Sequence, residues 1–464
     1  MLNRLTANLQ SQTWLRWLSV LVVLSLSAGL AYRGGRLGQL VLLGIPATGV
    51  ALVFLRWPPL GLAALIAASL LVPFAIGTGT QTSLNITVLL LSALFGLWLF
   101  DMFVRQRRIT LHPSRPILPL LGLAGAAGLA FIVGQLPWFT IAGAPLRSQL
   151  GGLAVFLLSV GAFLLAAHQM DDLRWLKVLT WLFLALGGLY VAGRLLPGLG
   201  TLTGRLFQQG STGGSLFWVW LVALGFSQAV FNQQLHIRWR LALGGLVLAA
   251  FYVGLFRGTA WASGWLPPLV AVVVILLVGM PRLGLLATLA GGIVGVINSQ
   301  KVINLVMVGD QQYSIMTRWE AWKILSEIIK VNPILGLGPA NYYFYTSLYP
   351  ILGWYVVFNS HNQYVDIVAQ TGLLGLACFL WYAWEIWRLG WRLRERVPEG
   401  FAKAYVYGAL GGLAGMLTAG MLADWVLPFV YNIGLAGFRA SVLGWLFLGG
   451  LVAIEQITAK QHQT

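Results

Sequence analysis

The sequence predicts an all-α, polytopic bundle of transmembrane helices, and its composition and its apolar runs carry that prediction. Of the 464 residues, 58% are hydrophobic and only 9% are charged, whereas soluble globular proteins carry about 25% charged residues. Apolar runs of about 20 residues, the length that crosses a hydrocarbon core, recur along the whole chain. Because these runs are continuous and do not alternate with polar residues, they predict helices and not the strands of a barrel.

We expect about 12–14 spans from hydropathy. They lie at residues 14–32, 38–55, 60–76, 86–104, 117–133, 148–167, 175–195, 215–231, 241–256, 261–278, 283–297, 364–387, 404–422 and 434–454. The chain then divides into N-terminal helices over 1–202, central helices with arginine-bearing outer loops over 203–298, a large loop over 299–361 and C-terminal helices over 362–464. The large loop is kept out of the hydrocarbon, so it is where chemistry is expected.

The formal net charge of +17 indicates membrane topology and not a nucleic-acid partner. Most Lys and Arg residues lie between the spans, and such residues are retained on the cytoplasmic side. With the N-terminus inside the cell, Arg107, Arg238 and Arg394 fall in cytoplasmic loops and residues 299–361 fall outside. The first apolar run lacks a small-residue cleavage site, so we expect it to remain as an anchor.

The large loop itself has a helical pattern. Ile315, Trp319, Trp322, Leu325 and Ile329 recur at helical spacing, which predicts an amphipathic helix. Pro333 and the glycines at 336 and 338 would end it. The aromatic run over 342–354 is typical of a surface at the level of the lipid headgroups; stacking on sugar rings is the alternative.

Three arginines on the outer side are candidates for binding an anion. Arg205 lies in the sequence TGRLFQQG over 203–210, Arg257 ends a span, and Arg318 begins the amphipathic helix. A guanidinium binds phosphate through a planar fork of donors. The alternatives are snorkelling to lipid headgroups for Arg205 and Arg257, and an exposed pair with Glu320 or Glu327 for Arg318.

His361 lies where the large loop meets the next span, and an imidazole takes up a proton near neutral pH. Its alternative role is at the start of the following helix, a role that Asn362 could share as a cap. Asp366 lies on the first turns of that helix, where it could orient His361 or face the interior of the bundle. Carboxylates within a membrane helix are functional candidates by default.

Several absences narrow the chemistry. The single cysteine, Cys378, excludes an intrachain disulfide and a Cys-based metal site. No cluster of His, Cys, Asp or Glu has metal-ligand spacing, and neither an Asp-x-Asp pair nor a Walker motif is present. The residues therefore predict a site with no metal and no cofactor, in which arginines bind an anion and a histidine handles a proton.

These motifs resemble those of the O-antigen ligase and O-antigen polymerase superfamily. The resemblance is carried by RWEAW at 318–322, NPILGLG at 332–338, SHNQY at 360–364 and QTGLLG at 370–375, in that order and roughly at the family's spacing. The upstream GRLF…G over 204–210 resembles the family's arginine loop. The similarity covers about residues 203 to 380, and the N-terminal third matches in hydropathy alone.

The resemblance implies a metal-independent glycosyltransferase that transfers a glycan from undecaprenyl diphosphate to an acceptor sugar hydroxyl, with inversion. Carried over to this sequence, Arg205 and Arg318 would hold the diphosphate and His361 would act on the acceptor hydroxyl as general base or align it. Further contacts with substrate are expected from the arginine that precedes a glycine, from two aromatic residues and from the residues after the histidine. These are Arg257, Trp319, Trp322, Asn362 and Asp366. The partners so implied are the lipid-linked donor, a lipid-anchored or glycan acceptor and membrane lipids.

Three alternatives stay open at this point. A polymerase would use the same chemistry with a growing glycan as acceptor. A transporter of bicarbonate or another small anion, described for some cyanobacterial relatives, would place its cations along a pore, but we find none of the related halves that transporters often have. A scaffold for polysaccharide export would have no chemistry of its own. The sequence does not specify the sugar, the acceptor or the oligomeric state.

Overall fold

The computed structural model describes residues 44, 48–77, 83–207, 211–257, 261–299 and 315–461. By its internal contacts the chain divides into two units, residues 1–60 and 61–464. In the first unit the described part is helical over Thr48–Arg56. The fold and the site described below belong to the second unit.

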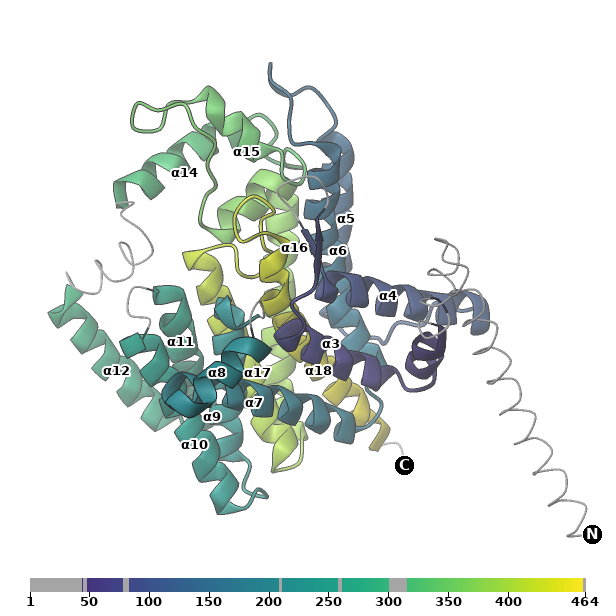
Figure 1. The fold of residues 1–464 in the computed structure, drawn as a ribbon, viewed down its shortest axis with the longest axis vertical. Coiled ribbons are helices and arrows are strands. Elements are labelled where there is room, and N and C mark those ends of the chain that lie inside the picture. Colours follow the sequence, from purple (N-terminus) through teal and green to yellow (C-terminus); the bar gives the residue numbers. More distant parts are fainter. Residues whose placement is uncertain are drawn as a thin grey trace, which may run out of the picture. The chain divides into compact units, whose positions relative to one another are not determined.

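Helices make up nearly all of the described secondary structure (Figure 1). The α-helices are α3 (Pro58–Leu71), α4 (Ile86–Phe100), α5 (Ile117–Val133), α6 (Leu146–Gln169), α7 (Leu173–Leu195), α8 (Pro197–Leu206), α9 (Ser215–Phe231), α10 (Ile237–Tyr252), α11 (Ala262–Gly279), α12 (Pro281–Ile297), α14 (Ile315–Ile329), α15 (Tyr342–Tyr345), α16 (Gln363–Arg396), α17 (Phe401–Leu422) and α18 (Gly434–Gln461). Short π-helical turns extend α4 over Asp101–Arg105 and α10 over Val253–Arg257, and 3-10 turns occupy Ser211–Gly213 and Thr346–Leu348. The two strands, β1 (Ala75–Gly77) and β2 (Ser83–Asn85), pair antiparallel with Ile76 opposite Leu84.

Eight helices of the described chain are long and apolar enough to cross a membrane. They are Ile86–Arg105, Leu146–Gln169, Leu173–Leu195, Ile237–Arg257, Ala262–Gly279, Gln363–Arg396, Phe401–Leu422 and Gly434–Gln461. Thr48–Arg56 with Pro58–Leu71 makes a ninth if the pair crosses as one span, and three apolar helices of 17 residues, α5, α9 and α12, are shorter. The expected polytopic helical bundle is therefore confirmed.

The centre of the bundle is formed by α6, α9, α17 and α18. Among the eight long spans α18 is the most deeply buried, and it packs against α6, while α17 packs against α9 and α11. Close approach of these helices is possible because small residues face their neighbours: a Cβ on Gly449 of α18 would lie 2.5 Å from the carbonyl oxygen of Phe163 in α6. α14 and α15 lie together at one end of this unit, near the start of α16 (Figure 1).

Several boundaries differ from those expected from hydropathy. In the span expected at 60–76 the helix ends at Leu71, and Ile76 lies in strand β1, which pairs with β2. A short apolar run of this kind does not distinguish a strand from a helix. The span expected at 364–387 is broken: α16 extends to Arg396, and Gly372 has φ 69° and ψ −175° within it. Residues 14–32 lie outside the described residues, as does half of 38–55.

Candidate functional site

The site begins with α14, the amphipathic helix expected in the large loop. Its bounds agree with the expectation, but its buried stripe does not. The buried side chains are Ala321, Ile324, Leu325 and Ile328, whereas Trp319 is exposed and Trp322 is half-buried. The expected buried face was chosen from the largest apolar side chains of the helix. A helix buries the stripe of residues that its neighbours cover, and in α14 that stripe includes a small residue, Ala321.

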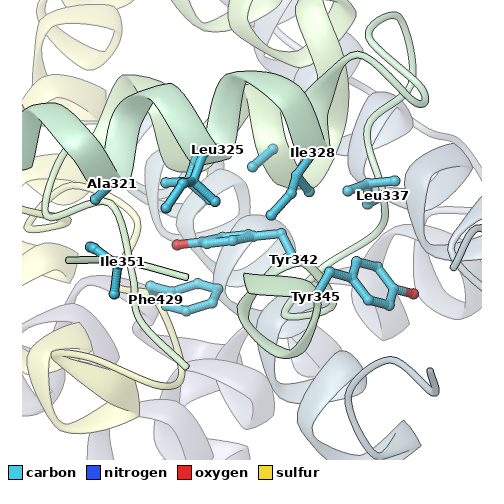
Figure 2. Packing of buried hydrophobic residues seen from close by; sticks show 10 residues of the cluster. Ala321, Leu325, Ile328, Leu337, Tyr342, Tyr345, Ile351 and Phe429 are labelled. Atoms are coloured by element: carbon cyan, nitrogen blue, oxygen red, sulfur yellow. The ribbon is translucent and has the colours of Figure 1, made fainter. Parts of the chain in front are cut away.

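The aromatic run after α14 is divided between the interior and the surface. Tyr342 of α15 packs beneath Leu325 and Ile328 of α14 (Figure 2), and its ring stacks on that of Phe429 with centroids 4.8 Å apart. Tyr345 is also buried, whereas Trp354 is exposed. Tyr342 and Tyr345 therefore form a core under α14, and neither anchoring at headgroups nor sugar stacking applies to them.

Main-chain hydrogen bonds join the glycine motif that follows α14, residues 332–338, to the glycine motif within α16, residues 370–375. Leu337 N donates to Ala369 O and Gly338 N to Gln370 O, at 3.0 Å each, while Leu373 N donates to Pro333 O at 2.8 Å. These bonds satisfy the backbone groups that the break at Gly372 leaves unpaired in the helix.

Glycine is required at this junction. Gly336 (φ 73°) and Gly372 (φ 69°) both adopt left-handed conformations. A Cβ on Gly336 would lie 2.5 Å from Gly372 N, and a Cβ on Gly372 would lie 2.0 Å from Ile334 O. The segment over 332–338 and the one over 370–375 therefore act as one structural unit. This unit fixes the position of the first part of α16, the helical residues between His361 and the break at Gly372.

His361 precedes that helix in an unusual backbone conformation. Its φ is 48°, a left-handed value that non-glycine residues adopt only where surrounding contacts hold them. His361 N donates to Asn359 Oδ1 at 3.3 Å. Asn362 is the N-cap of α16, and its Oδ1 accepts from Tyr364 N at 3.0 Å and from Val365 N at 3.3 Å. Asn362 is therefore the residue that caps α16, and the side chain of His361 does not contribute to the cap.

A buried hydrogen-bond network lies directly behind His361. Trp322 Nε1 donates to Ser360 O at 2.9 Å. The Ser360 hydroxyl lies 2.8 Å from Asp366 Oδ1, and the Tyr342 hydroxyl donates to the same carboxylate oxygen. Burial, and then the adjacent Asp366, raise the pKa of Tyr342 well above 10, so its hydroxyl remains a donor. Asp366 is fully buried and its bonds go to Tyr342 and Ser360, so it does not orient His361 by a direct bond.

The opposite wall is the loop between α17 and α18. Asp424 is fully buried, and its carboxylate accepts from Phe429 N at 2.6 Å and from the Asn432 side chain. Burial raises the pKa of Asp424 to about 6, against the effect of these bonds. Gln363 Oε1 accepts from Val426 N at 3.0 Å and from Leu427 N at 2.7 Å. The loop is thereby fixed to the start of α16.

Between these walls lies a cavity of about 520 Å³. Arg318 and Thr317 line it from α14, and His361 lines it with the five residues that precede it. Trp425 and Asn432 of the loop described above close the other side, with Tyr343 and Tyr431 stacked on each other at 4.8 Å. The structure therefore brings together two of the three residues expected to carry the chemistry, Arg318 and His361.

The charge of Arg318 acts on His361. Desolvation, and then the nearby Arg318 guanidinium, hold the pKa of His361 below its usual 6.5. The imidazole is therefore neutral at pH 7, which is the form that accepts a proton. A neutral base beside a fixed cation suits a reaction in which a proton is removed from one group while negative charge develops on another.

The other two candidate arginines lie elsewhere. Arg257 lines a second cavity, of about 380 Å³, with Arg194, Tyr190 and Thr203. Arg205 is in the last turn of α8, not in a loop, and it is exposed. As far as the described residues show, Arg205 lines neither cavity, although the preceding residue, Gly204, lines the second one.

Some residues of the site escaped the sequence analysis. Arg194 ends a transmembrane helix and resembles any basic residue at such a position, so nothing in the pattern distinguishes it. Trp425, Tyr431 and Asn432 lie more than sixty residues after His361, in a short segment between two spans. The one available signal was Asp424, an acidic residue between two apolar runs.

Two further observations bear on the class of site. In the described part of the chain no group of three or more His, Cys, Asp or Glu side chains is placed to hold a metal ion. A larger cavity, of about 710 Å³, lies between α7 and α10, but apolar side chains line it and it contains none of the candidate residues. The cavity with Arg318 and His361 is therefore the candidate active site.

Part of the chain is similar to a known family. Residues 199–380 match the family model described as O-Antigen ligase. The matched segment includes α8, α14, both glycine motifs and His361, and it ends within α16. No curated protein matches the chain.

Proposed function

Because residues 199–380 place this chain in the O-antigen ligase superfamily, whose members are membrane enzymes of ligase- or polymerase-type glycosyl transfer, we propose that it transfers a glycan from undecaprenyl diphosphate to an acceptor sugar hydroxyl. The single observation that supports this most is the shared cavity of Arg318 and His361. The reaction would take place on the periplasmic side of the inner membrane, without a metal ion.

In this proposal His361 accepts the proton of the acceptor hydroxyl as the oxygen attacks the anomeric carbon. The bond from that carbon to the diphosphate oxygen breaks, and its electron pair remains on the diphosphate. Attack from the face opposite the leaving group inverts the anomeric centre. The negative charge that grows on the diphosphate is stabilised by the Arg318 guanidinium, which is already in place before the bond breaks.

The remaining residues take supporting roles. Arg205 does not line the cavity of Arg318, so in this proposal the diphosphate is held there by Arg318, and Arg205 would contact the substrate only outside that cavity. Arg257 would bind phosphate together with Arg194, because the two guanidinium groups line one cavity. Exposed Trp319 would contact the lipid or the glycan at the entrance. Trp322 and Asn362 are engaged with Ser360 O and the start of α16, so they would shape the site and not bind the substrate directly.

The test is an assay of purified protein with an undecaprenyl-diphosphate-linked glycan and two acceptors, a lipid-anchored core saccharide and a free glycan. His361→Ala and Arg318→Ala are each expected to reduce transfer by at least about 100-fold, as the loss of a general base or a charge-stabilising donor does. Arg394→Ala is the control, because Arg394 packs on Trp391 and pairs with Glu395 at the far end of α16. Equal activity in all three variants would contradict the assignment, and the preferred acceptor would distinguish a ligase from a polymerase.

A further inference from the structure

We propose that Asp366 is a positioning residue: through Ser360 it holds His361 in the left-handed conformation that presents the imidazole to Arg318. Of the two tests below, only the kinetic one depends on the proposed function. Three contacts carry it, namely the Ser360 hydroxyl 2.8 Å from Asp366 Oδ1, the Tyr342 hydroxyl on the same oxygen, and Trp322 Nε1 on the carbonyl oxygen of Ser360.

The backbone of His361 requires such support. A side chain with a Cβ at φ 48° is strained, and a loop free to relax would leave that conformation. The loop is held on both sides of the strained residue. Ser360 is fixed through its side chain and its carbonyl oxygen, and Asn362 N donates to Ser360 Oγ at 2.9 Å. Asp366 is the group on which the Ser360 and Tyr342 hydroxyls converge.

Asp366 itself does not reach the reacting groups. Its side chain is fully buried and does not line the cavity. Within the described structure its second oxygen, Oδ2, has no hydrogen-bond partner. Asp366 Oδ1 accepts from the Tyr342 hydroxyl and lies 2.8 Å from the Ser360 hydroxyl, which also lies 2.7 Å from Asn362 O and has one proton for these two acceptors. Asp366 therefore acts as a scaffold, and an amide carbonyl oxygen in the same place would make the same contacts.

The electrostatic surroundings of His361 come from several elements. Arg318 faces it from α14, Tyr343 lines the same cavity from α15, and Tyr431 lines it from the loop before α18. Behind the loop lie Asp366 in α16 and Asp424, whose buried carboxyls influence each other. Movement of the loop would change the distance of the imidazole from Arg318 and its exposure to water together.

The first test uses steady-state transfer kinetics. Asp366→Leu removes the acceptor and is expected to lower kcat by about 100-fold, with KM for the lipid-linked donor changed by less than about threefold, because positioning acts on the reacting group and not on binding. Asp366→Asn keeps a carbonyl oxygen and is expected to retain kcat within about threefold. Glu385→Leu is the matched control, because it removes another buried carboxyl from α16, one that pairs with Arg388.

The opposite pattern would overturn the proposal. If Asp366→Asn is as inactive as Asp366→Leu, the carboxylate charge is needed and Asp366 is not merely a positioning residue. If Asp366→Leu keeps wild-type kcat, the network does not hold the histidine. Should Asp366→Leu fail to fold, Ser360→Ala and Trp322→Phe remove single contacts. Each is expected to lower kcat by about tenfold in protein that still unfolds cooperatively, with the melting temperature reduced by the lost hydrogen bond.

The second test does not depend on activity. Diethyl pyrocarbonate modifies neutral imidazole, so the rate of modification of the His361 peptide at several pH values, measured by mass spectrometry, gives the apparent pKa of His361. In the wild type it is expected below 6.5. In Asp366→Leu and Ser360→Ala the pKa is expected to rise toward 6.5. At a pH above the pKa in all proteins, where the imidazole is neutral, modification is expected to accelerate because the imidazole is more exposed to water, while the peptide with exposed His236 serves as internal standard. An unchanged profile in both variants would refute the positioning role even if no glycan transfer is found in the wild type, whereas a shifted profile without any transfer would refute the proposed function alone.

Discussion

At the scale of single residues, the sequence predicts the kinds of side chain in the site better than their partners. Arg318 and His361 could be selected because a guanidinium and an imidazole suit an anion and a proton, and they share a cavity. Arg205 was selected by the same reasoning and does not line it. The difference arises from which side chains the fold brings together, and neither composition nor local spacing contains that information. The backbone conformation of His361 was equally beyond a reading of residue types.

The planar fork of Arg318 makes a prediction of its own. Arg318→Lys keeps the charge but loses the paired donors, so transfer is expected to fall by at least about tenfold, since an ammonium cannot bind two oxygens of a diphosphate in the same fixed geometry. Turnover by purified variants, with Lys323→Arg as control, is the measurement. Lys323 pairs with Glu320 on the exposed side of α14. Full activity of Arg318→Lys would show that positive charge alone is sufficient.

The lowered pKa of His361 predicts how activity depends on pH. A base works when it is unprotonated, so kcat/KM should be constant above its pKa and fall as the pH decreases through it. Because burial and Arg318 lower the pKa, the fall is expected below pH 6.5. Arg318→Ala removes the second cause, so its residual activity should fall at a higher pH than that of the wild type. A profile centred above 6.5 in the wild type would contradict this role.

At the scale of elements, the sequence predicts where helices lie but not how they are broken or which face they bury. The bounds of α5, α9 and α14 agree with those expected from hydropathy and periodicity. The break in α16 was missed, because Gly372 is one of many glycines in apolar runs and its conformation is set by a partner about 35 residues earlier in the chain. α14 likewise buries Ala321 and exposes Trp319 because α15 and α16 decide its covered face.

The junction of the two glycine motifs predicts a selective loss of stability. Gly372→Ala would place a Cβ 2.0 Å from Ile334 O at a positive φ, and a cost of about 2–4 kcal/mol is expected from strain and displaced backbone bonds. Thermal unfolding in detergent would measure it. Gly125→Ala in α5 is the matched control, because no heavy atom lies within 4 Å of its Cβ, and helix propensity favours Ala by about 1 kcal/mol. Equal melting temperatures of the two variants would contradict the predicted contribution of this junction to stability.

At the scale of the whole molecule, composition alone predicts a multi-pass membrane protein, and the structure confirms it. The number of spans was harder to predict from the sequence. α3, α5, α9 and α12 have 14 to 17 residues each. α5 and α9 have the expected bounds and α3 ends before the expected end of its span, but in the described chain eight helices, or nine with the bent pair, are long enough to cross a membrane. Hydropathy counts apolar residues but does not detect where a chain turns. The side of the membrane on which each loop lies follows from the distribution of Lys and Arg, and it remains a prediction.

That topology can be tested with single cysteines. In a Cys378→Ser background, Trp354→Cys should react with a membrane-impermeant maleimide in intact cells, because Trp354 is exposed in the large loop. Glu395→Cys, at the exposed opposite end of α16, should react only after the cells are permeabilised. Reaction of Glu395→Cys alone in intact cells would reverse the proposed orientation and place the site in the cytosol.

The bonds between residues 333–338 and 369–374 join peptide groups and not side chains. Most amino acids supply identical peptide groups, so the side chains beside these bonds can be exchanged without removing the bonds. A saturation library over Ile334, Leu335, Leu373 and Leu374 should therefore be rich in active clones. The same design leaves little tolerance at Gly336 and Gly372, where an added Cβ would lie 2.5 Å or less from a backbone atom.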